Sequence, residues 1–69
     1  GISFLSWLGQ YDAAEQDRAL ERLSAYRASL TDSYDIDMFS RIVTYLLGDR
    51  DGLTDAGRAA QGRFRAKFR

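Results

Sequence analysis

The sequence predicts an all-α fold, a small bundle or orthogonal array of three main helices preceded by a short one. Apolar residues recur with the 3.6-residue spacing of a helix in three segments. A residue suited to cap a helix precedes each segment, and the 69 residues contain no proline. A chain of this length forms one domain, residues 1–69, and hides only about 60% of the surface that its unfolded form exposes. The core must therefore be thin.

The first helix is expected at residues 3–8. Apolar residues there come in doubled pairs, at 4–5 and 7–8, which is helical spacing rather than the alternation of a strand. Ser3 is suited to cap this helix, and Gly9 to end it in the left-handed conformation. A strand is the alternative for this segment.

The second helix is expected at residues 12–30. Asp12, followed three residues later by Glu15, is an N-terminal capping pattern. The segment TDSYD that follows the helix is rich in residues that favour turns. One side of the helical wheel collects Gln16, Ala19, Leu20, Leu23, Tyr26 and Leu30.

The third helix is expected at residues 37–47, with Asp35 or Asp37 as its cap and Gly48 as its end. A surface helix needs an apolar stripe of only about 100°. This segment exceeds that width, so it predicts a central helix covered on two sides, although the β-branched run 42–44 also suits a strand. The stripe comprises Ile36, Phe39, Ile42, Val43, Leu46 and Leu47, and Met38 and Tyr45 widen it.

The fourth helix is expected at residues 54–68, capped by Thr54 after the loop GDRDG. Gly57 should let another helix approach closely. Gly57 and Gly62 each cost the helix about 1 kcal/mol relative to alanine, so it needs docking to be stable. One face carries Leu53, Ala56, Gly57, Ala60, Phe64 and Phe68, and its flanks carry Arg58, Arg63, Arg65, Lys67 and Arg69.

The charges divide between the two halves of the chain, although the net charge is zero. Residues 1–40 hold seven acids against three arginines, a net of −4, and residues 41–69 hold seven cations against three aspartates, a net of +4. This division suits a protein partner, a nucleic acid or a chain whose own ends attract each other.

The chain lacks the residues that most enzymes and metal sites need. Without histidine or cysteine it has no His-dependent triad, no thiol nucleophile and no ordinary zinc site. Asp49, Asp51 and Gly52 match part of a calcium loop, but its first and twelfth positions would be Leu47 and Arg58, which offer no side-chain oxygen. The sequence predicts a protein that is not an enzyme and has no cofactor or metal. A metal or acid-catalysed site around Asp49 and Asp51 is the third and weakest hypothesis.

The number of aromatic residues is large for so small a core, so part of their surface should meet another macromolecule. The leading hypothesis is a non-enzymatic protein–protein interaction module: a small regulator, inhibitor or adaptor that forms a homodimer or docks on a larger protein. Aromatic residues and arginine are the types that interface centres favour. The candidate partner-binding residues are Phe4, Trp7, Met38, Tyr45, Arg63, Phe64, Arg65 and Phe68.

The alternative is a small nucleic-acid-binding protein that uses the basic C-terminal helix. Such binding would weaken steeply with salt, and the seven acids of residues 1–40 oppose it. In the simplest interpretation, the late cations only offset the helix dipole. No run approaches the roughly 20 apolar residues of a membrane span, and the apolar opening lacks the basic start of a signal peptide. We therefore expect no membrane partner and, with no cysteine, a cytoplasmic location.

Overall fold

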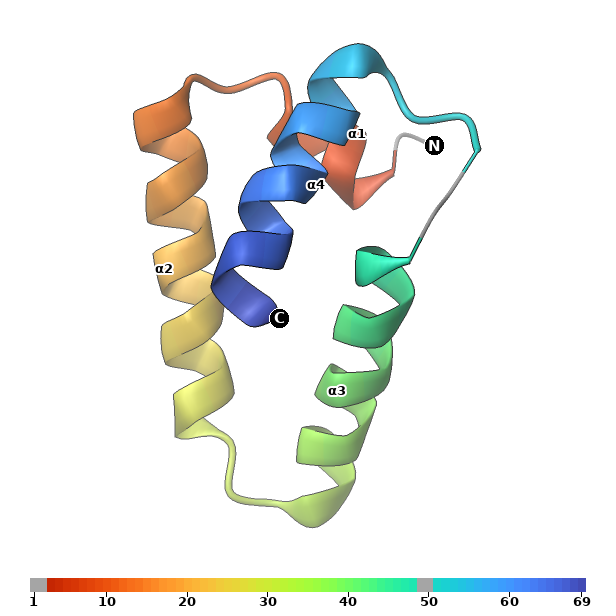
Figure 1. Cartoon of the computed structure of the whole chain (residues 1–69). Helices are drawn as coiled ribbons and strands as arrows, with labels where there is room; N and C mark the ends of the chain where they lie inside the picture. Colours follow the sequence, from red (N-terminus) through yellow and green to blue (C-terminus); the bar gives the residue numbers. More distant parts are fainter. Residues whose placement is uncertain (1–2, 49–50) are drawn as a thin grey trace.

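The computed structural model describes residues 3–48 and 51–69, and this part of the chain contains four α-helices and no strand (Figure 1). The predicted all-α class, three main helices after a short one, is confirmed. Helix α4 packs against each of the other three, and α2 and α3 stand on either side of it. The helices are α1 (Phe4–Leu8), α2 (Ala13–Ser29), α3 (Ser33–Leu47) and α4 (Asp55–Phe68).

Three of the predicted caps form as expected. Ser3, Asp12 and Thr54 each accept a hydrogen bond from the backbone N–H three residues further on, at 3.2, 2.8 and 2.9 Å. Each bond satisfies an N–H group that the first turn of the helix leaves without an internal partner. Local chemistry therefore fixes where α1, α2 and α4 begin.

The start of α3 differs from the prediction. The helix begins at Ser33 rather than at residue 37, and its cap is Asp32 instead of Asp35 or Asp37. The Asp32 carboxylate accepts hydrogen bonds from the N–H groups of Tyr34 and Asp35, at 2.8 and 3.3 Å. Aspartate and serine favour turns and helix starts for the same reason, because their side chains bind nearby backbone N–H groups. The segment TDSYD is therefore a cap and a first turn rather than a loop.

Two glycines allow α1 to lie directly against α4. A Cβ atom on Gly9 would stand 2.6 Å from the carbonyl carbon and oxygen of Ala56, and one on Gly57 would stand 3.0 Å from the hydroxyl of Ser6. The expected role of Gly57 is confirmed. The left-handed conformation expected at Gly9 is wrong, because its φ is −64°. Glycine is needed there for space and not for backbone freedom.

The core lies around the contact between α1 and α4. A buried glutamine, Gln61, also fastens α3 to α4, because its amide donates hydrogen bonds to the carbonyl oxygens of Leu46 and Gly48, at 2.9 and 2.8 Å. The core is as thin as the chain length predicts. Its buried apolar residues are Leu5, Leu8, Leu20, Leu46, Ala60 and Phe64.

The fold is open on one side of α3. The radius of gyration is 12.2 Å, against about 11 Å for an average domain of this length. The short helix α1 spans only about 8 Å, whereas α3 spans about 22 Å, so α1 cannot cover α3 along its length. Ile42 and Tyr45 consequently remain exposed. The prediction that this helix is covered on two sides is wrong for the chain by itself.

Candidate interaction surface

An apolar hollow of about 400 Å³ opens between α1, α2 and α3. We call it the α3 groove, because most of its lining comes from that helix. Phe4 closes it on the side of α1 and Leu23 on the side of α2, while Ser3 and Tyr45 contribute hydroxyl groups. The remaining lining residues are Phe39, Ile42, Val43, Tyr45 and Leu46.

A second hollow of about 490 Å³, the aromatic hollow, lies between α1 and α2. The Trp7 ring stands 5.1 Å from that of Tyr11, edge to face, and 5.8 Å from that of Phe4. Phe4 and Leu23 line both hollows, so the two form one continuous surface. The lining of the aromatic hollow is completed by Glu15, Arg18, Ala19, Arg22 and Tyr26.

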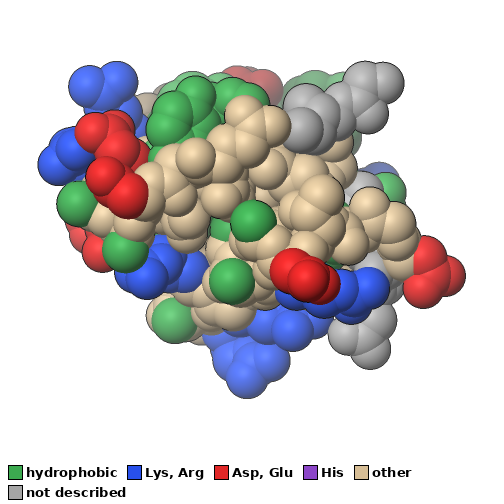
Figure 2. Space-filling model, turned by 90° about the horizontal axis from the view of Figure 1, so that it is seen from above, with side chains coloured by type: hydrophobic (Ala, Val, Ile, Leu, Met, Phe, Trp, Pro, Cys, Tyr) green, Lys and Arg blue, Asp and Glu red, His purple; other side chains and the backbone are tan. Residues whose placement is uncertain are grey.

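Apolar and basic side chains form their largest groups at different edges of the molecule in one view. Seen from above, a group of hydrophobic side chains lies along one edge, and a group of lysine and arginine side chains lies along the opposite edge (Figure 2). The aromatic hollow carries charge at one rim only, where Arg18 forms an ion pair with Glu15 and Arg22 lies one turn further along α2. The continuous surface is thus apolar with a basic margin.

The structure separates the predicted partner-binding residues into two groups. Phe4 and Tyr45 both line the α3 groove, Trp7 lines the aromatic hollow, and Met38 is exposed on α3. Phe64 instead has no exposed surface, because it is the centre of the core. The ring of Phe68 stacks on that of Phe64 at 4.8 Å and is half-buried, and Arg63 and Arg65 lie on α4, outside both hollows.

Three large exposed side chains of the continuous surface were not among the predicted site residues: Tyr11, Tyr26 and Ile42. Tyr26 and Ile42 belong to the apolar stripes of their helices, so the sequence assigned them to the core. Tyr11 lies just before a cap residue, where no periodicity indicates its position. Periodicity shows which face of a helix is apolar, but not whether another helix is long enough to cover it.

The basic side chains of α4 already bind groups of this chain. Arg63 donates to the carboxylate of Asp17 at 3.0 Å, and Lys67 donates to that of Glu21. Arg65 donates through Nε to the carbonyl oxygen of Leu47, at 2.9 Å. At Arg63 and Lys67 the charge division of the sequence draws the two halves together, as the self-attraction interpretation predicts.

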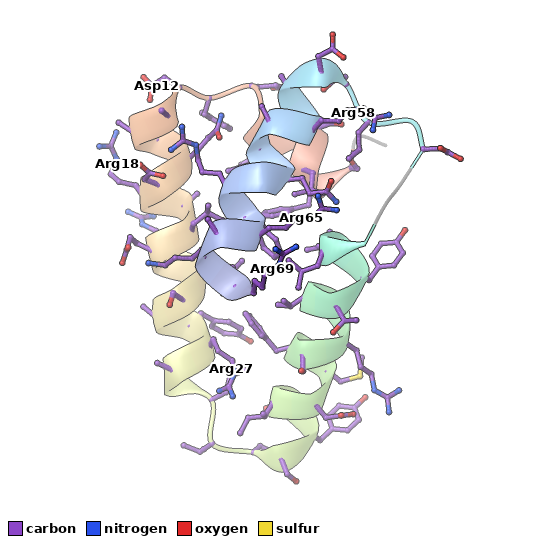
Figure 3. All side chains as sticks on the ribbon, viewed as in Figure 1. Asp12, Arg18, Arg27, Arg58, Arg65 and Arg69 are labelled. Carbon is purple, nitrogen blue, oxygen red and sulfur yellow. The ribbon has the colours of Figure 1, made fainter. Side chains whose placement is uncertain are left out.

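Arg58 and Arg65 lie on α4 and Arg69 directly follows it, and the Arg65 side chain points toward α3 (Figure 3). Arg58 and Arg69 are exposed to solvent. The basic helix therefore offers fewer available cations than its sequence suggests. Nucleic-acid binding through this helix stays a prediction.

The ion pair between Arg63 and Asp17 should add little stability. The two side chains are 40% and 61% exposed, and exposed pairs contribute at most about 1 kcal/mol. We expect a double-mutant cycle of Arg63→Ala and Asp17→Ala, measured by urea unfolding, to give a coupling below about 1 kcal/mol that falls further in high salt. A larger coupling that does not depend on salt would contradict this assignment.

The described residues contain no cluster of three or more carboxylates that could hold a metal ion. Asp49, one of the two carboxylates of the metal hypothesis, lies outside the described residues. The helices of residues 3–48 and 51–69 are all too short or too polar to cross a bilayer. No family model, curated protein or solved structure matches this chain. Its function must therefore be inferred from its own geometry.

Proposed function

We propose that the chain is a non-enzymatic protein–protein interaction module that binds through the α3 groove and the aromatic hollow. One observation carries the proposal: a continuous apolar and aromatic surface extends from Tyr11 on one side to Tyr45 on the other without being covered by the chain. Contiguous apolar patches on small soluble proteins mark sites of interaction.

The residue types on this surface are those of interface centres. Tryptophan, tyrosine and arginine are enriched there, because they combine a large contact area with few flexible bonds or with several hydrogen-bond donors. Trp7 is 39% exposed and its ring is held between those of Phe4 and Tyr11. A partly exposed ring that is already fixed loses little entropy when a partner covers it.

The groove also has the shape of an incomplete bundle. Helix α1 is five residues long, so the parts of α2 and α3 beyond it have no helix packed across them on that side. Helix α3 is longer than α1 by about 14 Å, or between two and three helical turns. A helix of another molecule would complete the layer that α1 begins. A domain that binds a helix of another protein in this way is suited to the role of regulator, inhibitor or adaptor.

The same observations give less support to nucleic-acid binding through α4. Arg63, Arg65 and Lys67 are engaged within the chain, whereas binding a polyanion requires cations that are available to phosphates. The groove contributes no cation to such a site, because its lining residues carry no charge.

Photo-crosslinking tests the proposal. A benzophenone side chain in place of Ile42 lies in the groove, and the same group in place of Ala25 lies at an exposed position of α2 that lines neither hollow. We expect irradiation in an extract of the source cells to give a discrete protein adduct at position 42 that excess unlabelled chain suppresses, and none at position 25. Adducts of equal yield at both positions, or none at either, would contradict the proposal.

A further inference from the structure

A second apolar stripe lies on α3, beside the one that faces the core. Its members are spaced by four, four and three residues, so they fall within about 80° of one another around the helix. We call it the outer stripe. It consists of Tyr34, Met38, Ile42 and Tyr45, which are 69%, 38%, 54% and 64% exposed.

The fold of the chain does not bury the outer stripe. The inner side of the same helix, through Val43, Leu46 and Leu47, already packs against the core. An exposed position on a helix of a monomer gains nothing from an isoleucine or a methionine, which in water lose about 25 cal/mol for every Å² of apolar surface left exposed. Four such residues in line on one helix indicate a surface that packs against a second helix.

We propose that this second helix is α3 of another copy of the chain, packed antiparallel about a twofold axis near Ser40. The inference rests on the proposed function and names its partner. In this register residues whose numbers add to about 80 lie at the same level, so Met38 faces the partner's Ile42 and Ile42 faces the partner's Met38. Tyr34 and the partner's Tyr45 are offset by only one residue, or about 1.5 Å along the helix axis. The outer stripe is therefore complementary to itself.

The charges beside the stripe fit the same arrangement. Asp37 and Arg41 form an ion pair at 2.9 Å on one flank of α3. A twofold axis perpendicular to the helices sets this flank against the same flank of the partner. Asp37 then lies only two residues, or about 3 Å along the axis, from the level of the partner's Arg41. Two aspartates and two arginines form a neutral, alternating group at the edge of the contact.

The chain also exposes more surface than an average monomer, by an amount that approaches what a stable dimer buries. The chain exposes 4838 Å², against about 4,400 Å² for an average monomer of its mass, 7.8 kDa. The excess of about 450 Å² in each copy amounts to about 900 Å² in a pair, three quarters of the roughly 1,200 Å² at which stable interfaces begin. The polar groups around the stripe, Asp37 and Arg41 among them, supply the rest.

Sedimentation velocity between about 5 μM and 1 mM tests the inference. We expect the full chain to dimerise, and Ile42→Glu to raise the dimer dissociation constant at least tenfold, because it places a carboxylate opposite the partner's Met38. The matched control is Ala25→Glu, which adds the same charge at an exposed position of α2 outside both hollows and should leave the constant unchanged. Circular dichroism should show the same helix content in all three proteins.

Charge reversal tests the antiparallel register. Asp37→Arg and Arg41→Asp should each weaken the dimer several-fold, because each sets like charges against each other, and the double variant should restore affinity to within about twofold of the original. Failure of the double variant to restore affinity would overturn this register. A dimer indifferent to Ile42→Glu, or a chain that stays monomeric at every concentration, would overturn the inference as a whole.

The two proposals fail in different ways. A monomeric chain that still forms a specific adduct with another protein from position 42 keeps the interaction function and removes the second copy as its occupant. An adduct with twice the mass of the chain supports both proposals. Absence of both the dimer and the adduct removes both.

Discussion

Truncating Phe64 to alanine is expected to unfold the protein at 25 °C. The side chain has no exposed surface and is the largest of the fully buried residues. Its ring meets that of Phe4 edge to face at 6.3 Å and stacks on that of Phe68 at 4.8 Å. Phenylalanine-to-alanine substitutions in cores cost about 3–5 kcal/mol. A core this small rarely supplies more than about 3–5 kcal/mol in total, so the loss equals the whole stability.

Urea unfolding followed by circular dichroism measures the effect, with Phe68→Ala as the matched control. Phe68 is half-buried and is the last residue of α4. Its truncation therefore leaves a smaller cavity and should lower the free energy of unfolding clearly less. The Phe68→Ala protein should keep a cooperative transition, whereas the Phe64→Ala protein should show none. A Phe64→Ala variant that unfolds cooperatively at nearly the original urea concentration would show that the core is not centred on this ring.

A comparison of Phe64 with the exposed aromatic residues shows how much of the candidate site could be predicted from the sequence. Composition indicates more aromatic surface than a thin core hides, and the exposure of Trp7, Tyr11 and Tyr45 agrees with that expectation. Which rings are surplus depends on which helix lies opposite each one. Phe64 and Tyr45 both belong to apolar faces of predicted helices, yet α1 covers the first ring and leaves the second exposed.

The helices themselves could be predicted more fully than their contacts. Caps and periodicity depend on residues within one turn, so Ser3, Asp12 and Thr54 mark their helices correctly. Asp32 is not predicted as a cap because it lies in a segment whose residues suit a turn equally well. The role of Gln61 depends on the carbonyl oxygens at the end of α3, 13 and 15 residues away. No local pattern indicates such a contact.

Substitution of Gly9 by alanine is expected to have the second large effect on stability, because α1 packs on α4 through a contact that leaves no room for a side chain at this position. Gly9→Ala places a Cβ atom 2.6 Å from the backbone of Ala56, and backbone atoms cannot rotate away as a side chain would. Helix α1 must move off α4, which exposes Leu5 and Leu8 of the core. Overpacking of this kind typically costs about 1–3 kcal/mol, or a fall in Tm of roughly 4–8 °C for each kcal/mol in a domain of this size.

Gly62→Ala is the matched control for Gly9→Ala. Gly62 also lies in a helical region, but nothing stands within 4 Å of a Cβ atom added there. The same substitution should therefore stabilise the protein by up to about 1 kcal/mol through helix propensity alone. Thermal unfolding should move in opposite directions for the two variants, and a shift of the same sign in both would contradict the close packing of α1 on α4. Because Phe4 and Trp7 of α1 line the two hollows, Gly9→Ala should also change the fluorescence of Trp7 and weaken partner binding, whereas Gly62→Ala should change neither.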